Sequence, residues 1–128
     1  MRLRLFVPVP LVLALCALIS GCSSKSNKAT NVVTVTEPFE SGDLGTVAPG
    51  NTFVHTFTTE GVFGFHCRHH GGMTGTVTVA AGGADSVIWP MGPGNLFGTP
   101  SPGSTVKPGT PHYVRWINSS GVHTVTRP

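Results

Sequence analysis

The sequence predicts an all-β domain, a sandwich of two sheets, over residues 32–128. Short runs of alternating apolar and polar residues recur through this part of the chain, and almost none of it carries a helical period. Gly and Pro separate the runs, as they do between the strands of β proteins. The apolar positions include many Val, Phe and Trp residues, which can fill the space between two packed sheets. At 128 residues the chain has room for one such domain.

Eight strands are expected, each where an alternating run lies between breaks. They are residues 32–36, 52–58, 61–67, 75–80, 86–89, 104–106, 113–118 and 122–126. Turns are expected at the dipeptides Pro49-Gly50, Gly71-Gly72, Gly82-Gly83 and Pro108-Gly109. Residues 90–104 are too rich in Gly and Pro for regular structure, so we expect an ordered surface loop there.

A secretion signal is expected over residues 1–21. Arg2 and Arg4 precede an apolar run, residues 5–19, that is too short to span a membrane. As a helix it would reach about 22 Å, against about 30 Å of hydrocarbon. The closing Ile19-Ser20-Gly21-Cys22 resembles the lipobox of bacterial lipoproteins, in which the cysteine is acylated.

This lipobox resemblance implies a protein of the cell envelope, anchored by lipid on Cys22 to a membrane at the periplasmic or another extracytoplasmic face. The polar residues 22–31 would then be a flexible tether. An ordinary signal with a chance cysteine is the alternative.

Loss of the leader changes the cysteine count and the charge. Cys16 would leave with it and Cys22 would carry lipid, so only Cys67 keeps a free thiol. A lone thiol cannot form a disulfide within the domain, which favours a metal or redox role. Without Arg2 and Arg4, six basic residues face five acidic ones, so the charge gives no case for nucleic acid binding.

The chemistry is concentrated in residues 61–79. Cys67, His70 and Met73 place a thiolate, an imidazole and a thioether three residues apart, around a Gly-containing turn between two strands. Copper held by one Cys and two His, with a weak axial Met, is the blue electron-transfer site. One imidazole is missing from this segment. A buried structural Cys, a core role for Met73, and Met91 as the axial donor are the alternatives.

Residues 61–79 resemble the ligand loop of cupredoxins, and the Cys-x2-His-x2-Met spacing resembles the short loop of amicyanin and other small plastocyanin-like proteins. Residues 39–57 resemble the strands that precede this loop, so the likeness runs unbroken from about residue 37 to 79. In cupredoxins the remaining His follows a Val-x-Trp-x-Asn stretch that precedes the loop. Here that stretch comes after it, as Val114, Trp116 and Asn118, and leads to His123-Thr-Val.

The resemblance implies a cupredoxin-like Greek-key β-sandwich with a circularly permuted strand order. It also implies one type 1 copper ion, held by Cys67, His70, Met73 and His123. Residues 80–85 would join the old termini, and residues 33–36 repeat the pattern of residues 123–126. A truncated two-domain protein is the competing explanation.

The sequence departs from the family in two places. Thr124 stands after the expected ligand His123, where plastocyanin and azurin carry Asn, and residues 110–112 lengthen the turn before the strand that contains Trp116. A changed group next to a ligand can shift the reduction potential.

Four further histidines are not assigned to the metal. His69 competes with His70, but the Cys-x2-His spacing selects His70 and leaves His69 facing solvent. His66 is expected on the opposite strand face from Cys67. His55 alternates with phenylalanines and should be half-buried, whereas His112 lies in a loop.

The expected function is one-electron transfer in the bacterial cell envelope, without enzymatic activity. His70 would be the electron port, and redox partner proteins would dock around it on a mainly apolar surface with Arg68 at its rim. The alternatives are a copper carrier or store and, with less support, a copper enzyme. Nitrite reductases resemble this chain in having His before the copper Cys. Their further ligand, five residues beyond the other copper His, is Pro128 here, and Arg68 breaks the His-Cys-His of multicopper oxidases.

Overall fold

The computed structural model describes residues 36–128, and these residues form an all-β domain. Its strands are β1 (Phe39–Glu40), β2 (Thr52–His55), β3 (Gly61–His66), β4 (Thr74–Ala84), β5 (Ser86–Met91), β6 (Thr105–Val106), β7 (Tyr113–Asn118) and β8 (Thr126–Arg127). The expected signal, tether and nearly all of the first expected strand lie outside the described residues. Across residues 36–128 no helix is long and apolar enough to cross a membrane.

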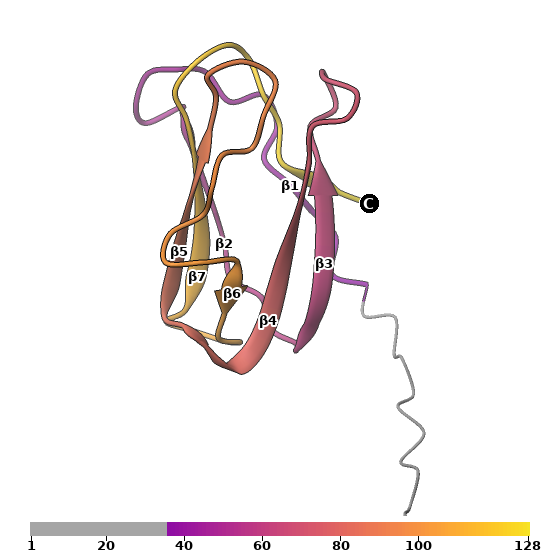
Figure 1. Ribbon diagram of the computed structural model, residues 1–128, viewed down its shortest axis with the longest axis vertical. Coiled ribbons are helices and arrows are strands. Elements are labelled where there is room, and N and C mark those ends of the chain that lie inside the picture. Colours follow the sequence, from indigo (N-terminus) through magenta and orange to yellow (C-terminus); the bar gives the residue numbers. More distant parts are fainter. Residues whose placement is uncertain (1–35) are drawn as a thin grey trace, which may run out of the picture. The chain divides into compact units, whose positions relative to one another are not determined.

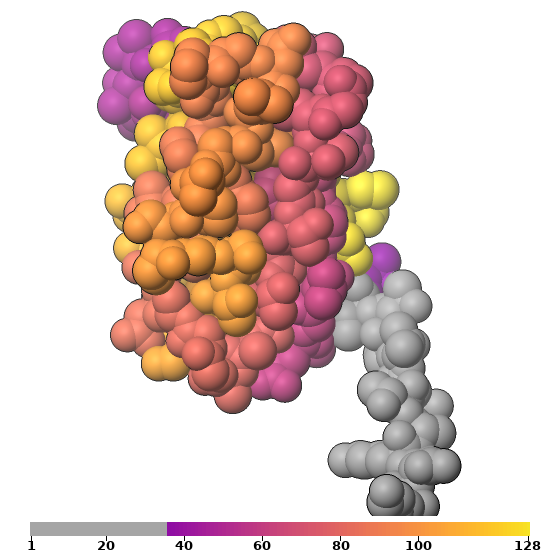
Figure 2. Space-filling model, in the orientation of Figure 1, coloured from indigo at the N-terminus to yellow at the C-terminus, as the bar shows by residue number. Residues whose placement is uncertain are grey.

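The strands form two sheets that face one another (Figure 1). One sheet has the order β1-β8-β3-β4-β6 and the other β2-β7-β5. Their pairings are antiparallel except for β4 with β6 and β5 with β7. The chain between β5 and β7, orange in Figure 2, lies across one side of the sandwich. Its β6 pairs with β4 of one sheet, whereas Ser101 bridges Ile88 of the other.

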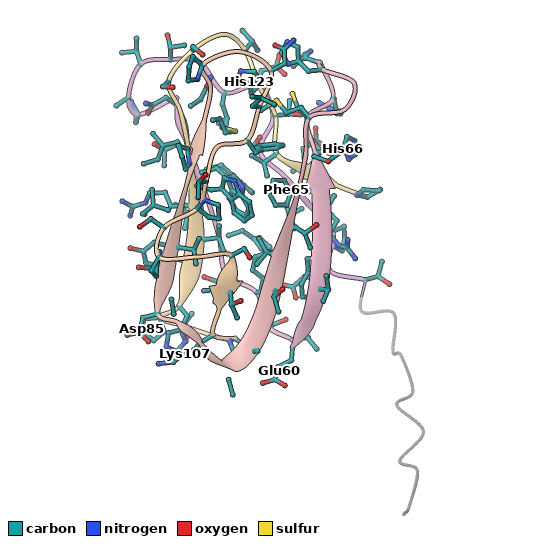
Figure 3. All side chains as sticks on the ribbon, viewed as in Figure 1. Glu60, Phe65, His66, Asp85, Lys107 and His123 are labelled. Atoms are coloured by element: carbon teal, nitrogen blue, oxygen red, sulfur yellow. The ribbon has the colours of Figure 1, made fainter. Side chains whose placement is uncertain are left out.

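The core lies between the sheets and follows from alternation along the strands. In β3, Phe63 and Phe65 are buried, whereas His66 points away from the core on the other face (Figure 3). The Phe65 ring meets Trp89 of β5 at 5.1 Å and Trp116 of β7 at 5.3 Å between centroids, both edge-on. Such aromatic pairs contribute about 0.5–1.5 kcal/mol each beyond the apolar area they bury. They therefore fix the sheets against each other beneath the end where the metal ligands are expected.

The turn expected at Gly82-Gly83 is wrong. β4 continues through both glycines to Ala84, with an irregular register against β6 between Val79 and Ala84. A Cβ atom at Gly83 would collide with the backbone of Val106. Gly83 therefore permits a close approach of two strands within a sheet, and residues 80–84 belong to a strand and not to a loose connection.

The strand expected at residues 122–126 is mostly absent. Only Thr126 belongs to β8, and His123 makes an isolated bridge with Leu44. The ladder is interrupted because two backbone N–H groups donate to side chains: Thr124 to the sulfur of Cys67, and Val125 to the hydroxyl of Ser41. The irregular backbone thus belongs to the same segment that carries His123.

The remaining strand predictions are close to the structure, although two regions differ. β1 lies at residues 39–40, after the strand expected at 32–36, and Thr36 is in no strand. In the expected loop, β5 extends to Met91, which bridges Phe97. The Phe97 ring packs on Phe65 with centroids 4.8 Å apart, so the loop contributes to the core.

Candidate metal centre

Three side chains from two distant parts of the sequence meet at one end of the sandwich. The Cys67 sulfur lies 3.5 Å from Nδ1 of His70 and 3.8 Å from Nδ1 of His123. The two Nδ1 atoms are 3.2 Å apart. Cys67 and His123 are buried and His70 is half-buried. Among the described residues, this is the one cluster of His, Cys, Asp or Glu side chains close enough to hold a metal ion.

The spacing of these donors fits a single metal ion. An ion bonded to two imidazoles at about 2.0–2.1 Å and to a thiolate at about 2.3 Å, in a trigonal plane, requires donors about 3.5–3.8 Å apart. The three observed separations differ from these values by a few tenths of an ångström. One thiolate with two imidazoles is the equatorial donor set of a type 1 copper site, so chemistry and spacing agree.

The loop between β3 and β4 carries two of the donors and is closed by its own backbone. The N–H of Cys67 donates to the carbonyl of Met73 (3.0 Å), and the N–H of Met73 donates to that of His70 (3.2 Å). Gly72 has a φ of +84°, a backbone conformation that residues other than glycine rarely adopt. Met73 is 1% exposed. Its sulfur as the axial donor stays a prediction, and Met91, the alternative, is also buried.

His123 is held at the metal-binding end of the sandwich, opposite the end that carries Glu60, Asp85 and Lys107 (Figure 3). It is 1% exposed. Burial lowers the pKa of its imidazole, and the nearby His70 lowers it further. A lowered pKa favours the neutral ring, which is the form that offers Nδ1 as a metal ligand.

Thr124, the residue after His123, joins the two parts of the site. Its N–H donates to the Cys67 sulfur (3.4 Å), and its hydroxyl oxygen accepts the N–H of Arg68 (2.8 Å) and the hydroxyl of Thr126 (3.1 Å). A hydrogen bond to a thiolate stabilises its negative charge. The sequence marked Thr124 only as a departure from the family, and no local signal predicted these partners.

Two side-chain pairs, each with one acidic partner, lie at the surface beside the ligand loop. His69 Nε2 lies 2.7 Å from a carboxylate oxygen of Asp43, and Arg68 pairs with Glu40. All four side chains are largely exposed, so each pair adds little to stability. The expected exposure of His69 is confirmed. The sequence did not predict that Asp43 and Glu40 would pair with His69 and Arg68.

The other unassigned histidines lie away from the donor cluster. His55 packs between Phe39 and Phe57, with ring centroids 4.7 Å away in each case, and its Nε2 lies 3.2 Å from Glu37. His66 faces outward on β3 (Figure 3).

His112 lies in the turn before β7, beside Asp85. The hydrogen bond and charge of Lys107 hold the pKa of Asp85 below its usual value. This group is at the end of the sandwich opposite the metal centre (Figure 3).

Comparison with known proteins agrees with the donor set. The model of the plastocyanin/azurin family of copper-binding proteins matches residues 23–80. The matched range contains Cys67, His70 and Met73 but not His123, which only the folded structure brings to the other donors. No curated protein and no solved structure matches the chain significantly.

The family match covers Cys67, His70 and Met73, and the geometry brings Cys67 and His70 together with His123. The fold is also the expected one, an all-β sandwich of two sheets. Residues 23–80 of the chain are therefore similar to the plastocyanin/azurin family of copper-binding proteins, and the donor set is compatible with a single type 1 copper site.

Proposed function

We propose that this protein is a one-electron carrier of the bacterial cell envelope. The observation that carries the proposal is the meeting of one thiol and two imidazoles at one end of the sandwich, with donor separations of 3.2–3.8 Å. Copper bound there would supply a one-electron couple. The donor residues are Cys67, His70 and His123, and we propose Met73 as the weak axial fourth.

The surroundings of the donors suit electron transfer because they resist movement. Backbone hydrogen bonds close the loop that carries Cys67 and His70, and the backbone of His123 is paired with Leu44. Donors held by the fold need little rearrangement when the charge at the site changes, and small rearrangement favours fast transfer.

His70 is the natural electron port, because it is the one donor of the three that is partly exposed. The loops around it carry exposed apolar side chains at Val47, Leu96 and Val122. These loops lie at the same end of the sandwich as the ligand loop (Figure 1). A mainly apolar surface rimmed by a few charges, here Arg68 and Glu40, suits brief docking of redox partner proteins.

We further propose that lipid on Cys22 anchors the protein to a membrane and that residues 22–31 are its tether. Proteins of this family are generally extracytoplasmic. The lipobox-like tetrad supports the lipid anchor, and a periplasmic or other extracytoplasmic face follows from the secretion signal. The permuted strand order also stays a proposal, supported by the position of His123 after the other three donors in sequence.

The proposal is tested by loading the purified protein with Cu(II). We expect an intense visible band from thiolate-to-copper charge transfer, which a reductant bleaches and an oxidant restores. Cys67→Ser should lose the band and stay folded, since the hydroxyl keeps the size but not the thiolate donor. His112→Gln, at the opposite end, is the matched control and should keep it. Copper binding without this band, or bleaching that does not reverse, would contradict electron transfer and favour copper carriage or storage.

A further inference from the structure

Asn118, the last residue of β7, has a buried side chain that forms hydrogen bonds to the two backbone segments next to His123. It is 0% exposed, and with His123, Thr124 and Thr126 it makes up the buried polar side chains of residues 36–128. A buried primary amide destabilises the fold unless its hydrogen-bonding groups are satisfied. The partners of this amide therefore indicate which parts of the fold it holds.

The Asn118 amide joins two separate segments. Its Nδ2 lies 2.9 Å from each of three carbonyl oxygens, those of Leu44, Gly45 and Gly121. Its Oδ1 accepts the N–H of Ser120 at 3.3 Å. The NH2 group has two hydrogens for three acceptors, so two of the acceptors share one hydrogen. Because all three neighbours are carbonyl oxygens, the amide atom that faces them is the nitrogen and not the oxygen. One side chain thus holds the turn before His123 against residues 44–45.

Those two segments determine where His123 lies. The N–H of Leu44 donates to the carbonyl of His123 (2.8 Å), and the N–H of His123 donates to the carbonyl of Leu44 (3.4 Å). The Leu44 carbonyl thus accepts from both Asn118 and His123. On the other side, a Cβ built on Gly121 would lie 3.4 Å from Nε2 of His123. Asn118 therefore fixes the backbone before His123 and the backbone beside it.

Asn118 itself is fixed to the sheet. Its N–H donates to the carbonyl of Asn51 (2.8 Å), and its carbonyl accepts from the side chain of Asn51 (3.3 Å). The neighbouring inward residue of β7, Trp116, is fully buried. His123 lies in irregular backbone, so its position depends on such contacts and not on a strand ladder.

We infer that Asn118 is a positioning residue of the metal centre, which holds His123 in place for metal binding by fixing the backbone on both sides of it. The inference rests on the metal-binding part of the proposed function and not on electron transfer. Groups that orient a metal ligand typically change metal affinity by about 10–100-fold when removed. Loss of the Asn118 amide should therefore weaken metal binding, although Asn118 touches none of the donor atoms.

The test compares Asn118→Ala with two controls, using Cu(II) and, as a spectroscopic probe, Co(II) added to the full-length protein. Ser119→Ala removes a side-chain hydrogen bond next to Asn118, from the Ser119 hydroxyl to the carbonyl of Met91, that does not reach residues 44–45 or 121. Val77→Ala removes buried core volume in β4 and reports the effect of lower stability alone. Affinity is measured by competition with a chelator, and amide hydrogen exchange at Leu44 and His123 is measured in the metal-free protein.

We expect Asn118→Ala to lose about 10–100-fold in affinity, to change the charge-transfer spectrum, and to exchange faster at Leu44 and His123. Neither control variant should show all three changes, in affinity, in spectrum and in exchange at Leu44 and His123. Affinity and exchange in Asn118→Ala equal to those in Ser119→Ala would overturn the inference. If Asn118→Ala does not fold, Asn118→Ser is used in its place, because serine keeps one hydrogen-bond donor and should give an intermediate metal affinity. A metal affinity of Asn118→Ser equal to that of the wild type would also overturn the inference. A wild-type protein that binds neither metal would instead refute the proposed function.

Discussion

The backbone N–H of Thr124 donates to the sulfur of Cys67 across 3.4 Å, joining residues 57 positions apart in the sequence. The hydroxyl of the same threonine accepts the N–H of Arg68, the residue that follows Cys67. One residue therefore contacts the thiolate donor and also holds the start of the ligand loop. Because its side chain is 0% exposed, water cannot replace either contact.

Thr124→Val should destabilise the metal-free protein by about 1–3 kcal/mol, because valine keeps the shape but leaves the N–H of Arg68 without its acceptor. Urea denaturation measures the change. Thr124→Ser keeps the hydroxyl and is the matched control, expected to lose less. Equal stability of the valine variant and the wild type would show that this hydrogen bond does not stabilise the loop.

His123→Gly should abolish the intense visible band of the copper-loaded protein, because it removes one of the gathered donors. Added imidazole should restore the band in part, since it can occupy the space of the missing ring. His66→Gly, on the outer face of β3, should keep the band without imidazole. A band that persists in His123→Gly would remove His123 from the ligand set. The point change is preferable to truncation, because residues 119–128 include the buried Val125 and strand β8.

Met73→Leu should keep a weaker visible band and raise the reduction potential, since a weak axial donor is lost while the three other donors stay. The swap of two buried side chains of similar volume should cost less than about 1.5 kcal/mol. Voltammetry and absorption measure the two effects. A colourless variant would contradict an axial role, and an unchanged potential would point to Met91 instead.

Gly83→Ala should destabilise the domain by about 1–3 kcal/mol, as overpacking does, because the new methyl group collides with the backbone of Val106. Gly82→Ala is the neighbouring control, since a Cβ there meets nothing within 4 Å. Thermal denaturation of both variants measures the difference. If the two variants were equally stable, β4 and β6 would not approach as closely as the structure describes. Metal affinity should change in neither, because both glycines lie far from the donors along β4.

Cys22→Ala should release the protein from membranes, since acyl chains and no protein span would hold it there. Fractionation of cells that express the two forms measures this. Cys16→Ala, which alters a cysteine inside the expected leader, should leave the membrane fraction unchanged. Retention of Cys22→Ala in that fraction would mean that another feature anchors the protein.

The sequence predicts the strands and the ligand loop well, because both are local patterns. Alternation along β3 predicts which residues enter the core, and the three-residue spacing places Cys67, His70 and Met73 on one loop. His123 could be predicted only through its resemblance to a family pattern, since nothing local marks an unpaired imidazole as a ligand.

The rest depends on contacts between distant residues. Two of the three acceptors of the Asn118 amide lie 73 and 74 positions away at Gly45 and Leu44, so no local window of sequence contains them. Gly82-Gly83 predicts a turn by composition, yet β6, some twenty residues later, makes the same pair part of a strand. The shortened β8 has a similar cause, because the N–H of Thr124 finds a sulfur from another part of the chain.

The separation of the donors along the chain affects how the unfolded protein meets metal ions. His70 is three residues from Cys67, so an unfolded chain can offer both to one ion, whereas His123 lies 53 residues beyond His70. Closing a flexible loop of that length costs about 3–4 kcal/mol in chain entropy. The complete chelate therefore forms readily only in the folded domain, where this entropy has already been lost. Metal binding should consequently stabilise the folded state relative to the unfolded state, and copper should bind the chain more weakly before it folds than afterwards.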